Sequence, residues 1–166
     1  MTAPDVWTVA PEDFDSPVAA MLWRAYYTEV SDRWYRLYEG RATDPVELER
    51  GIAATSGGEF AAPRGVFLVA HYAGEPVGTA GVHLLDDATA ELNRVFVLAD
   101  MRGKGGAGLL VAAAEQHART LGAERMVLDT RLDLVEARAL YARLGYAEST
   151  PHNDQMYAEC WYRKKL

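Results

Sequence analysis

The clearest pattern of apolar and polar positions in the chain lies between residues 107 and 121. Its apolar residues recur at intervals of three and four, as they do on one face of an α-helix. Gly122 follows the last of them, at the place where a helix end commonly has glycine. The pattern therefore predicts a helix, and its buried face is formed by Ala107, Leu110, Val111, Ala114, Ala118 and Leu121.

Strands are predicted on both sides of this helix. Residues 91–97 and 125–129 are rich in Val, Leu, Met and Phe, which favour strands. The glycine-rich segment 102–108 lies between the first strand and the helix. Glycine lets the backbone turn tightly and approach a ligand closely, and the first amides of a helix have no partner inside it. Together with the helix dipole these features predict a phosphate site, to which Arg102 and Lys104 add positive charge.

The rest of the chain alternates between the same two patterns. Ser16-Pro17 and Asp44-Pro45 are typical helix starts, and the first helix either continues through Asp32 or breaks near it. Glu29 and Arg33 have the spacing of an exposed ion pair on that helix. Gly78 and Gly81 predict a bulge or a close backbone approach. A further helix is expected at residues 135–144, and further strands at 7–10, 66–72, 76–85, 146–148 and 156–163.

Composition restricts the class of protein. The chain of 166 residues suits one domain, residues 1–166, with a sizeable core. A net charge of −7 argues against a nucleic-acid binder and is compatible with a cationic substrate. The single cysteine, Cys160, excludes an intrachain disulfide. No apolar run resembles a signal peptide or a membrane span, so we expect a cytoplasmic protein without membrane contact.

The glycine segment also fits the dinucleotide-binding fingerprint. Gly103, Gly105 and Gly108 have its spacing, and Asp129 follows about twenty residues on. Three features argue against that assignment. Residues 98–102 separate the strand from the first glycine, the strand follows predicted hairpins, and too few residues follow Thr130 to complete a doubly wound fold.

A second family fits better. Arg102-x-x-Gly105-x-Ala107 resembles the acyl-CoA pyrophosphate loop of the GCN5-related N-acetyltransferases. Residues 91–97 resemble the fourth strand of that family, and residues 137–146, with Leu140-Tyr141, resemble its "LYxxLGF" segment. The resemblance implies an α/β fold with a mixed, mostly antiparallel central sheet of about six to seven strands, flanked by about four helices. It also implies an enzyme that transfers an acetyl group from acetyl-CoA to a primary amine.

The resemblance further implies where acetyl-CoA binds. In this family the fourth strand splays from the fifth, and the pantetheine arm enters the gap. That places the arm against the main chain of Val95, Phe96 and Val97. The pyrophosphate would lie on Arg102, Gly103, Lys104, Gly105, Gly106, Ala107 and Gly108.

Two residues have the types and positions that the chemistry requires. Glu91 matches the glutamate that removes the amine proton in many members, although it could equally be a solvent-facing strand residue or the partner of an arginine. His83, His71 and Glu29 are weaker alternatives. Tyr141 matches the tyrosine that gives a proton to the departing thiolate, although its spacing alone fits a core tyrosine.

The acceptor side is less defined. The first helices of the family cover the acceptor, which implicates Tyr26, Glu29 and Arg33. Arg33 and Arg36 could bind a carboxylate on an amino-acid-like acceptor, but small-molecule, N-terminal and lysine amines all remain open. Many relatives have an asparagine seven residues before the tyrosine, and this chain has Leu134 there, beside Asp133.

No metal is implied, because the four histidines are scattered along the sequence. Cys160 lies in an apolar segment, which favours direct attack in a ternary complex over a covalent acyl-enzyme. A non-catalytic acyl-CoA sensor on the same fold remains the alternative. Many relatives form homodimers through their last strands, where Trp161 and Tyr162 would lie at an interface or in the core.

Overall fold

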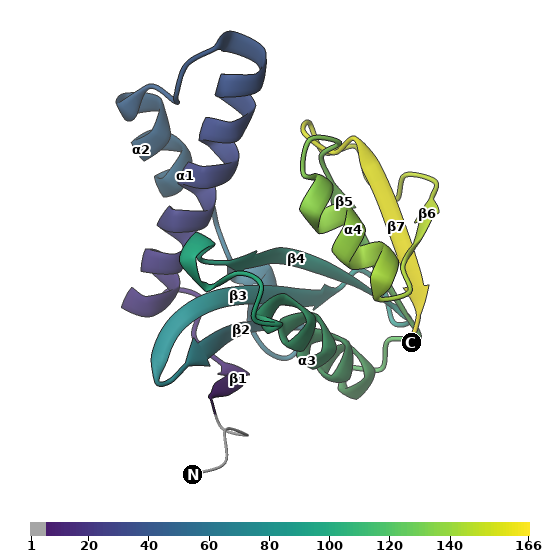
Figure 1. The fold of residues 1–166 in the computed structure, drawn as a ribbon. Helices are drawn as coiled ribbons and strands as arrows, with labels where there is room; N and C mark the ends of the chain where they lie inside the picture. Colours follow the sequence, from purple (N-terminus) through teal and green to yellow (C-terminus); the bar gives the residue numbers. More distant parts are fainter. Residues whose placement is uncertain (1–5) are drawn as a thin grey trace.

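The computed structural model describes residues 6–166, which form one seven-stranded sheet and four α-helices (Figure 1). The strand order is β1-β2-β3-β4-β5-β7-β6, and β4–β5 is the parallel pair among otherwise antiparallel neighbours. The predicted mixed, mostly antiparallel α/β fold is therefore confirmed. The elements are β1 (Trp7–Pro11), α1 (Pro17–Glu39), α2 (Pro45–Ala54), η2 (Gly58–Phe60), β2 (Gly65–Tyr72), β3 (Glu75–Leu84), β4 (Thr89–Val97), η3 (Ala99–Met101), α3 (Gly106–Thr120), β5 (Arg125–Thr130), α4 (Val135–Arg143), β6 (Ala147–Ser149) and β7 (Cys160–Lys165).

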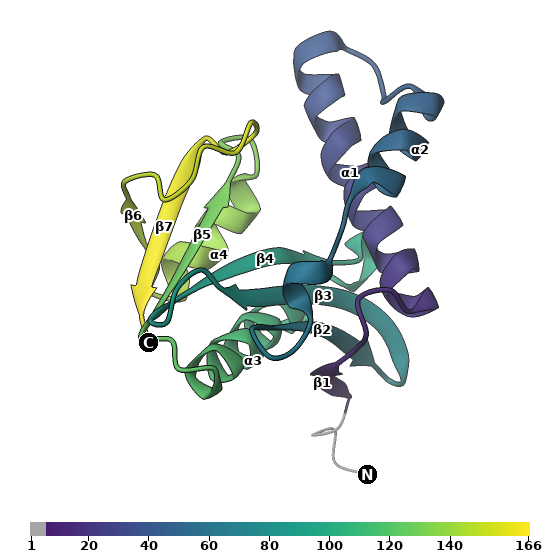
Figure 2. The same ribbon diagram turned by 180° about the vertical axis from the view of Figure 1, so that it is seen from behind.

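The two faces of the sheet bury different helices. Along β2, alternate side chains point to opposite faces. Leu68 and Ala70 join the core beneath α3, whereas Phe67 and Val69 pack with Leu22 of α1. Helices α3 and α4 thus lie on one side of the sheet and α1 on the other, as Figures 1 and 2 show from opposite directions. No helix within residues 6–166 has the length and apolar character needed to cross a membrane. The prediction that the chain lacks a signal peptide rests partly on residues 1–5, which lie outside the described residues.

Helix α1 does not break near Asp32, and two of its charged side chains form ion pairs with other elements. The Ser16 hydroxyl accepts the Ala19 amide, and the helix continues past Asp32 until Gly40 stops it with φ 67°. The Glu29–Arg33 ion pair, which the spacing permits, does not form among the described residues. Each of the two side chains instead binds a partner far away in the sequence, and both contacts join α1 to the region around the glycine segment and α4. Glu29 binds Arg102 at 2.7 Å, and Arg33 binds Glu136 at 3.0 Å.

The C-terminal strand begins later than predicted. Residues 156–159 form a turn and connection, and β7 starts at Cys160, where pairing with Thr130 of β5 begins. Met156, the first residue of the predicted strand, is 84% exposed. Tyr146 is buried immediately before β6 rather than part of it, and its hydroxyl donates to Glu115 of α3 at 3.1 Å. Tyr162 lies in the core, and the Trp161 indole is bonded within the chain, so both side chains serve internal packing.

Candidate active site

The site begins where β4 and β5 part. The two strands pair only from Thr89↔Arg125 to Glu91↔Val127 and then diverge (Figure 1). A cleft of about 570 Å³ opens there, between β4, α1, the start of α3 and α4. The predicted splay is confirmed, and it leaves the backbone of residues 92–97 at an edge that faces the cleft. Unpaired strand edges offer N–H and C=O groups to an extended ligand.

Strand β4 has a bulge in the part that lines the cleft. The register between β3 and β4 shifts so that Thr79 pairs with Phe96 while Gly81 pairs with Asn93. Arg94 has a left-handed backbone with φ 54°, and its carbonyl accepts the Thr79 hydroxyl at 2.7 Å. A Cβ at Gly78 would lie 2.7 Å from the Phe96 carbonyl oxygen, so glycine is needed for this close approach. Both expectations for the glycines of β3, bulge and close approach, are confirmed.

The glycine segment folds as a turn into α3. Gly103 and Gly105 have φ of 79° and 85°, values that glycine adopts without strain. The helix has no side-chain cap at Gly105, so its first amides remain available. All seven residues of segment 102–108 except Lys104 line the cleft. The ammonium of Lys104 instead lies 5.4 Å from the ring centre of Tyr72.

Trp7 of β1 holds this turn in place, a contact that no pattern in the sequence predicts. Its indole N–H donates to the Lys104 carbonyl at 3.1 Å, and a Cβ at Gly106 would overlap its ring. The ring also contacts Tyr72 edge-on, with 5.0 Å between centroids. Strand β1 therefore positions the backbone of the predicted phosphate site.

Arg102 ties the turn to two other elements. Its Nε donates to the Val97 carbonyl at 2.9 Å, and its Nη2 donates to Glu29 at 2.7 Å. The guanidinium also lies 5.5 Å from the ring centre of Phe96. The side chain thus spans from the end of β4 to α1 along one wall of the cleft.

Tyr141 projects from α4 into the cleft. It is 7% exposed, and no group in the described chain is hydrogen-bonded to its hydroxyl. Burial raises the pKa of Tyr141 above its ordinary value, so the hydroxyl keeps its proton at neutral pH. A core position and a position facing the cleft, which the sequence presented as alternatives, are both occupied by the same side chain.

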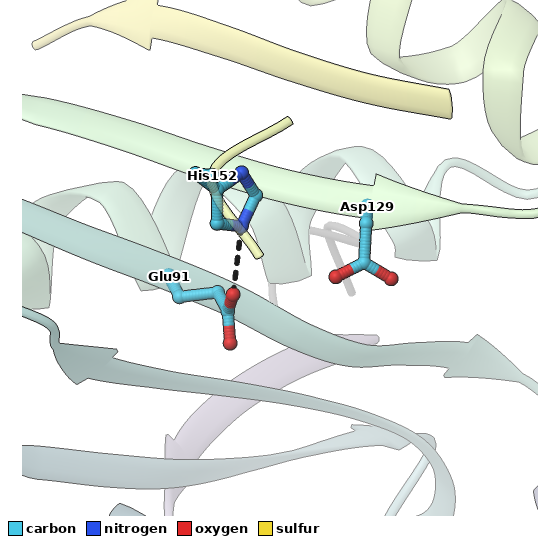
Figure 3. Close-up of side chains that lie close together, drawn as sticks. All are labelled: Glu91, Asp129 and His152. Atoms are coloured by element: carbon cyan, nitrogen blue, oxygen red, sulfur yellow. Dashed lines mark hydrogen bonds and ion pairs between the residues drawn. The ribbon is translucent and has the colours of Figure 1, made fainter. Parts of the chain in front are cut away.

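Glu91 is enclosed at the apex of the splay rather than exposed in the cleft. Its Oε2 lies 2.8 Å from Nε2 of His152 (Figure 3). Its Oε1 accepts the Asn93 amide at 3.0 Å. Nε2 of His83 lies 3.7 Å away on the other side. Glu91 is therefore neither a solvent-facing residue nor an arginine partner, and two histidines that are distant in the sequence meet at its carboxylate.

Asp129, near the end of β5, lines the cleft. Burial raises the pKa of Asp129 above its ordinary value, and the nearby Glu91 acts in the same direction. Asn153 connects the two acids, because its amide nitrogen donates to Asp129 at 2.7 Å and to Glu91 at 3.3 Å. The Trp161 indole donates to the amide oxygen at 3.0 Å and so fixes the orientation of the amide.

Glu91, Asp129 and His152 bring one ligating atom each within 4.8 Å of one another (Figure 3). This donor set could hold a divalent cation, a grouping that the scattered sequence positions did not predict. The amide N–H groups of Asn153, however, already supply both carboxylates with hydrogen bonds. The arrangement accordingly fits a hydrogen-bonded pair of acids without requiring an ion.

The predicted acceptor residues Tyr26, Glu29 and Arg33 all line the cleft. The guanidinium of Arg33 is engaged, because it donates to the Asp133 carbonyl at 2.6 Å and to Glu136 at 3.0 Å. That contact lowers the pKa of Glu136. Arg36 lies 3.8 Å from Asp32. The guanidinium of Arg131 donates to both carboxylate oxygens of Asp133. Leu134 lines the cleft.

Four residues in or beside the cleft have no signal of their own in the sequence. Arg94 belongs to a predicted strand, and Asp129 is singled out only by the dinucleotide fingerprint. His152 and Asn153 belong to a polar loop whose position depends on β5–β7 pairing. The polar composition of this loop is the one feature of the sequence that could have indicated a role for it.

Comparison with known proteins agrees with the geometry. Residues 18–146 match the acetyltransferase (GNAT) family model. The chain is 37% identical over 90 residues to the N-acetyltransferase YjgM of Escherichia coli, an alignment that covers 52% of this chain and 54% of that protein. It is 37% identical over 81 residues to the aminoalkylphosphonate N-acetyltransferase of Salmonella typhimurium, covering 46% of this chain and 53% of that one. The chain thus aligns with about half the length of these curated relatives.

Solved structures agree on the fold. The PaiA N-acetyltransferase of Thermoplasma acidophilum, determined in complex with coenzyme A, superposes with a TM-score of 0.71 at 15% identity, covering 96% of this chain and 99% of that one. The family match covers most of the chain and includes β4, the glycine turn and α4. This chain belongs to the GNAT family of acetyltransferases.

Proposed function

We propose that the protein is an N-acetyltransferase that moves the acetyl group of acetyl-CoA to a primary amine, by direct attack in a ternary complex. The observation that carries this proposal is the parting of β4 and β5 beside a glycine turn that starts a helix. A thioester arm fits the open edge of β4, and a pyrophosphate fits the free amides of the turn. Family membership supports the same assignment.

In this proposal the cofactor follows three surfaces. The pyrophosphate lies on the amides of Gly103 to Gly108, and Arg102, which lines the same part of the cleft, supplies positive charge. The pantetheine arm runs along the main chain of Val95, Phe96 and Val97 like an added strand. A backbone N–H of this edge is aimed at the thioester oxygen, where negative charge develops in the transition state.

The chemical step needs two proton transfers. The amine nitrogen forms a bond to the thioester carbon, the C–S bond breaks, and the amine loses a proton while the thiolate gains one. Tyr141 is the proton donor to sulfur, because its side chain faces the cleft and its hydroxyl has no hydrogen-bond partner in the described chain. Cys160 lies in β7 with its thiol directed to the Thr130 carbonyl at 3.4 Å, which fits a mechanism without an acyl-cysteine.

Glu91 and Asp129 act together as the base. Asp129 lines the cleft and meets the amine, and Glu91 is joined to it through Asn153. The desolvation that raises the pKa of Asp129 brings it closer to the pKa that an efficient general base needs. We assign the ring proton of His152 to Nε2, where it donates to Glu91, since an ionised carboxylate can only accept.

The test is free-thiol release from acetyl-CoA by the purified protein with a panel of amines. The panel contains amino acids, polyamines, aminoglycosides, short peptides and an aminoalkylphosphonate, the acceptor type for which one relative is named. Amine-dependent release establishes the activity and names the acceptor class. Acetyl-CoA binding without release from any amine would instead favour a non-catalytic acyl-CoA sensor. Failure to bind CoA would contradict the assignment of the glycine turn.

A further inference from the structure

We infer that the acceptor is a primary amine that carries an acidic group, a carboxylate or a phosphonate, and that Arg94 binds the acidic group while Asp129 faces the amine. This inference rests on the proposed acetyltransferase function and deepens it by naming the substrate class. It assigns the acid-binding role to Arg94 in place of Arg33.

The guanidinium of Arg94 is a sheltered cation with free donors. It lies 4.1 Å from the ring centre of Trp23 and 5.1 Å from that of Phe60. Burial lowers the pKa of Arg94, although an arginine remains charged at any physiological pH. A guanidinium has five N–H donors, and in the described chain only the bond from Nη2 to the Ser56 carbonyl, at 2.7 Å, uses one of them. None of its remaining nitrogens is sealed from solvent without a partner.

The other arginines around the cleft differ from Arg94 in their partners. Arg33 is bound to Glu136, and Arg102 is bound to Glu29. Arg143 also lines the cleft, but it is exposed at the end of α4, where solvent weakens ion pairing. Arg94 therefore combines partial burial with the absence of an ion pair within 4 Å among the described residues. A desolvated charge of this kind gains most when an anion binds to it.

Glu59 of η2 is the acidic side chain whose charge acts on Arg94. The two groups are nevertheless too far apart for an ion pair. Glu59 is exposed, so its attraction is screened by water. An acceptor acid would meet the guanidinium inside the cleft, where screening is weaker, and it can accept two parallel hydrogen bonds from the fork.

Asp129 supplies a negative group to the same cleft. Arg94 lies over the ring of Trp23, and that ring contacts Tyr26 edge-on with 5.6 Å between centroids. Tyr26 packs in turn against Phe96 of β4, with 5.2 Å between centroids, and Tyr26, Asp129 and Tyr141 all line the cleft. The cleft thus offers a cation at Arg94 and an acid at Asp129. This arrangement is complementary to a molecule with one acid and one amine.

The first experiment needs only the unaltered protein and matched substrates. We would measure kcat/KM for ω-amino acids and aminoalkylphosphonates of increasing chain length, each against its amide or alcohol, with rates corrected to the free amine. A bidentate charge-assisted contact predicts a preference of about tenfold to hundredfold for the acid. The best chain length then reports the spacing between Arg94 and the reacting amine.

Variants locate the preference. Arg94→Gln is expected to reduce it to about one, and Arg94→Lys to retain part of it, because lysine keeps the charge but loses the fork. All three residues have a Cβ, so the left-handed backbone at this position is equally strained in each. Glu59→Gln is expected to lower KM for the acid alone. Arg50→Gln, a charge change at an exposed residue of α2 outside the cleft, serves as the matched control.

The outcomes separate this inference from the proposed function. Equal rates for acids and their amides would overturn the inference and leave the acetyltransferase standing. Loss of the preference in Arg33→Gln with retention in Arg94→Gln would return the role to Arg33. No transfer to any amine would overturn both proposals. If Arg94→Gln does not fold, the matched substrates and Glu59→Gln still decide the question.

Discussion

Gly106 offers the sharpest test of how the glycine turn is held. Replacing it with alanine adds one methyl group at the first position of α3. That methyl would overlap Cη2 of Trp7 and lie 2.8 and 2.9 Å from Cζ3 and Cζ2. The backbone of Gly106 has no positive φ, so the substitution acts through this contact and not through strain at residue 106.

The contacts of Trp7 set the magnitude. To make room, the ring must move away from the Lys104 carbonyl, to which it donates at 3.1 Å, and from Tyr72, whose centroid is 5.0 Å away. A hydrogen bond of this kind contributes about 1 kcal/mol, and overpacking costs typically about 1–3 kcal/mol. We expect a loss of about 2 kcal/mol in the free energy of unfolding, or about 4–8 °C in Tm for a domain of this size. Because the turn moves with the ring, Kd for acetyl-CoA should also rise.

Gly108→Ala is the matched control, since it lies two residues further along the same helix. No atom lies within 4 Å of a Cβ at that position, and its φ is not positive. Alanine should therefore stabilise the unliganded helix by up to about 1 kcal/mol. Urea and thermal unfolding without ligand measure both variants, and a titration with acetyl-CoA measures the turn.

A double-mutant cycle supplies the refutation. In a Trp7→Ala background the added methyl has no ring to meet, so Gly106→Ala should become nearly neutral, with a coupling of about 2 kcal/mol. If Gly106→Ala costs the same with and without Trp7, the ring does not hold the turn. The same conclusion follows if Gly106→Ala and Gly108→Ala shift Tm equally.

Four further outcomes are expected. Tyr141→Phe should lower kcat about tenfold to hundredfold while KM for acetyl-CoA stays within about twofold; an unchanged kcat would remove Tyr141 from the mechanism. Arg102→Ala should raise KM for acetyl-CoA about tenfold with little change in kcat, and an equal loss in both would place its role in the transition state. Burial raises the pKa of Asp129, so the folded state loses stability as pH rises above the ordinary carboxyl pKa of about 4. Asp129→Asn should therefore gain stability relative to the parent protein between about pH 4 and 7, as measured by urea titrations. A difference in stability that stays constant over this range would contradict the prediction. Glu115→Ala should cost about 3 kcal/mol in chemical denaturation, because it leaves the ammonium of Lys164, bonded at 2.8 Å, without its partner, and Lys164→Met in the same chain should recover part of that loss.

The parts of the site that the sequence predicted depend on residues close together in the chain. The spacing of Leu110, Val111 and Ala114 defines the buried face of α3, and these residues are indeed buried against the sheet. Gly103 and Gly105 have the positive φ that a tight turn requires. Each of these features depends on neighbours within a few residues, and so it is visible in a short window of sequence.

The missed parts depend on contacts between distant segments. The left-handed backbone of Arg94 arises from a register shift against β3, and nothing in the residues around it distinguishes it from regular strand. His152 and Asn153 reach Glu91 only because β7 pairs with β5 and returns their loop to the apex of the splay. Trp7 meets the glycine turn across about a hundred residues of sequence, a distance over which periodicity carries no information.

Strand register explains why Glu91, the carboxylate chosen by resemblance, does not line the cleft, whereas Asp129 does. Glu91 pairs with Val127, the last pair before β4 and β5 separate. Side chains two residues apart share a face of a sheet, so the next positions on that face are Asn93 and Asp129, and both line the cleft. Glu91 thus closes the apex, and Asp129 stands one step further out, with the Asn153 amide between them. In the proposed mechanism Asp129 is the acid that meets the amine, and burial raises its pKa, so the acid limb of kcat/KM belongs to Asp129, and Asp129→Asn should remove that limb.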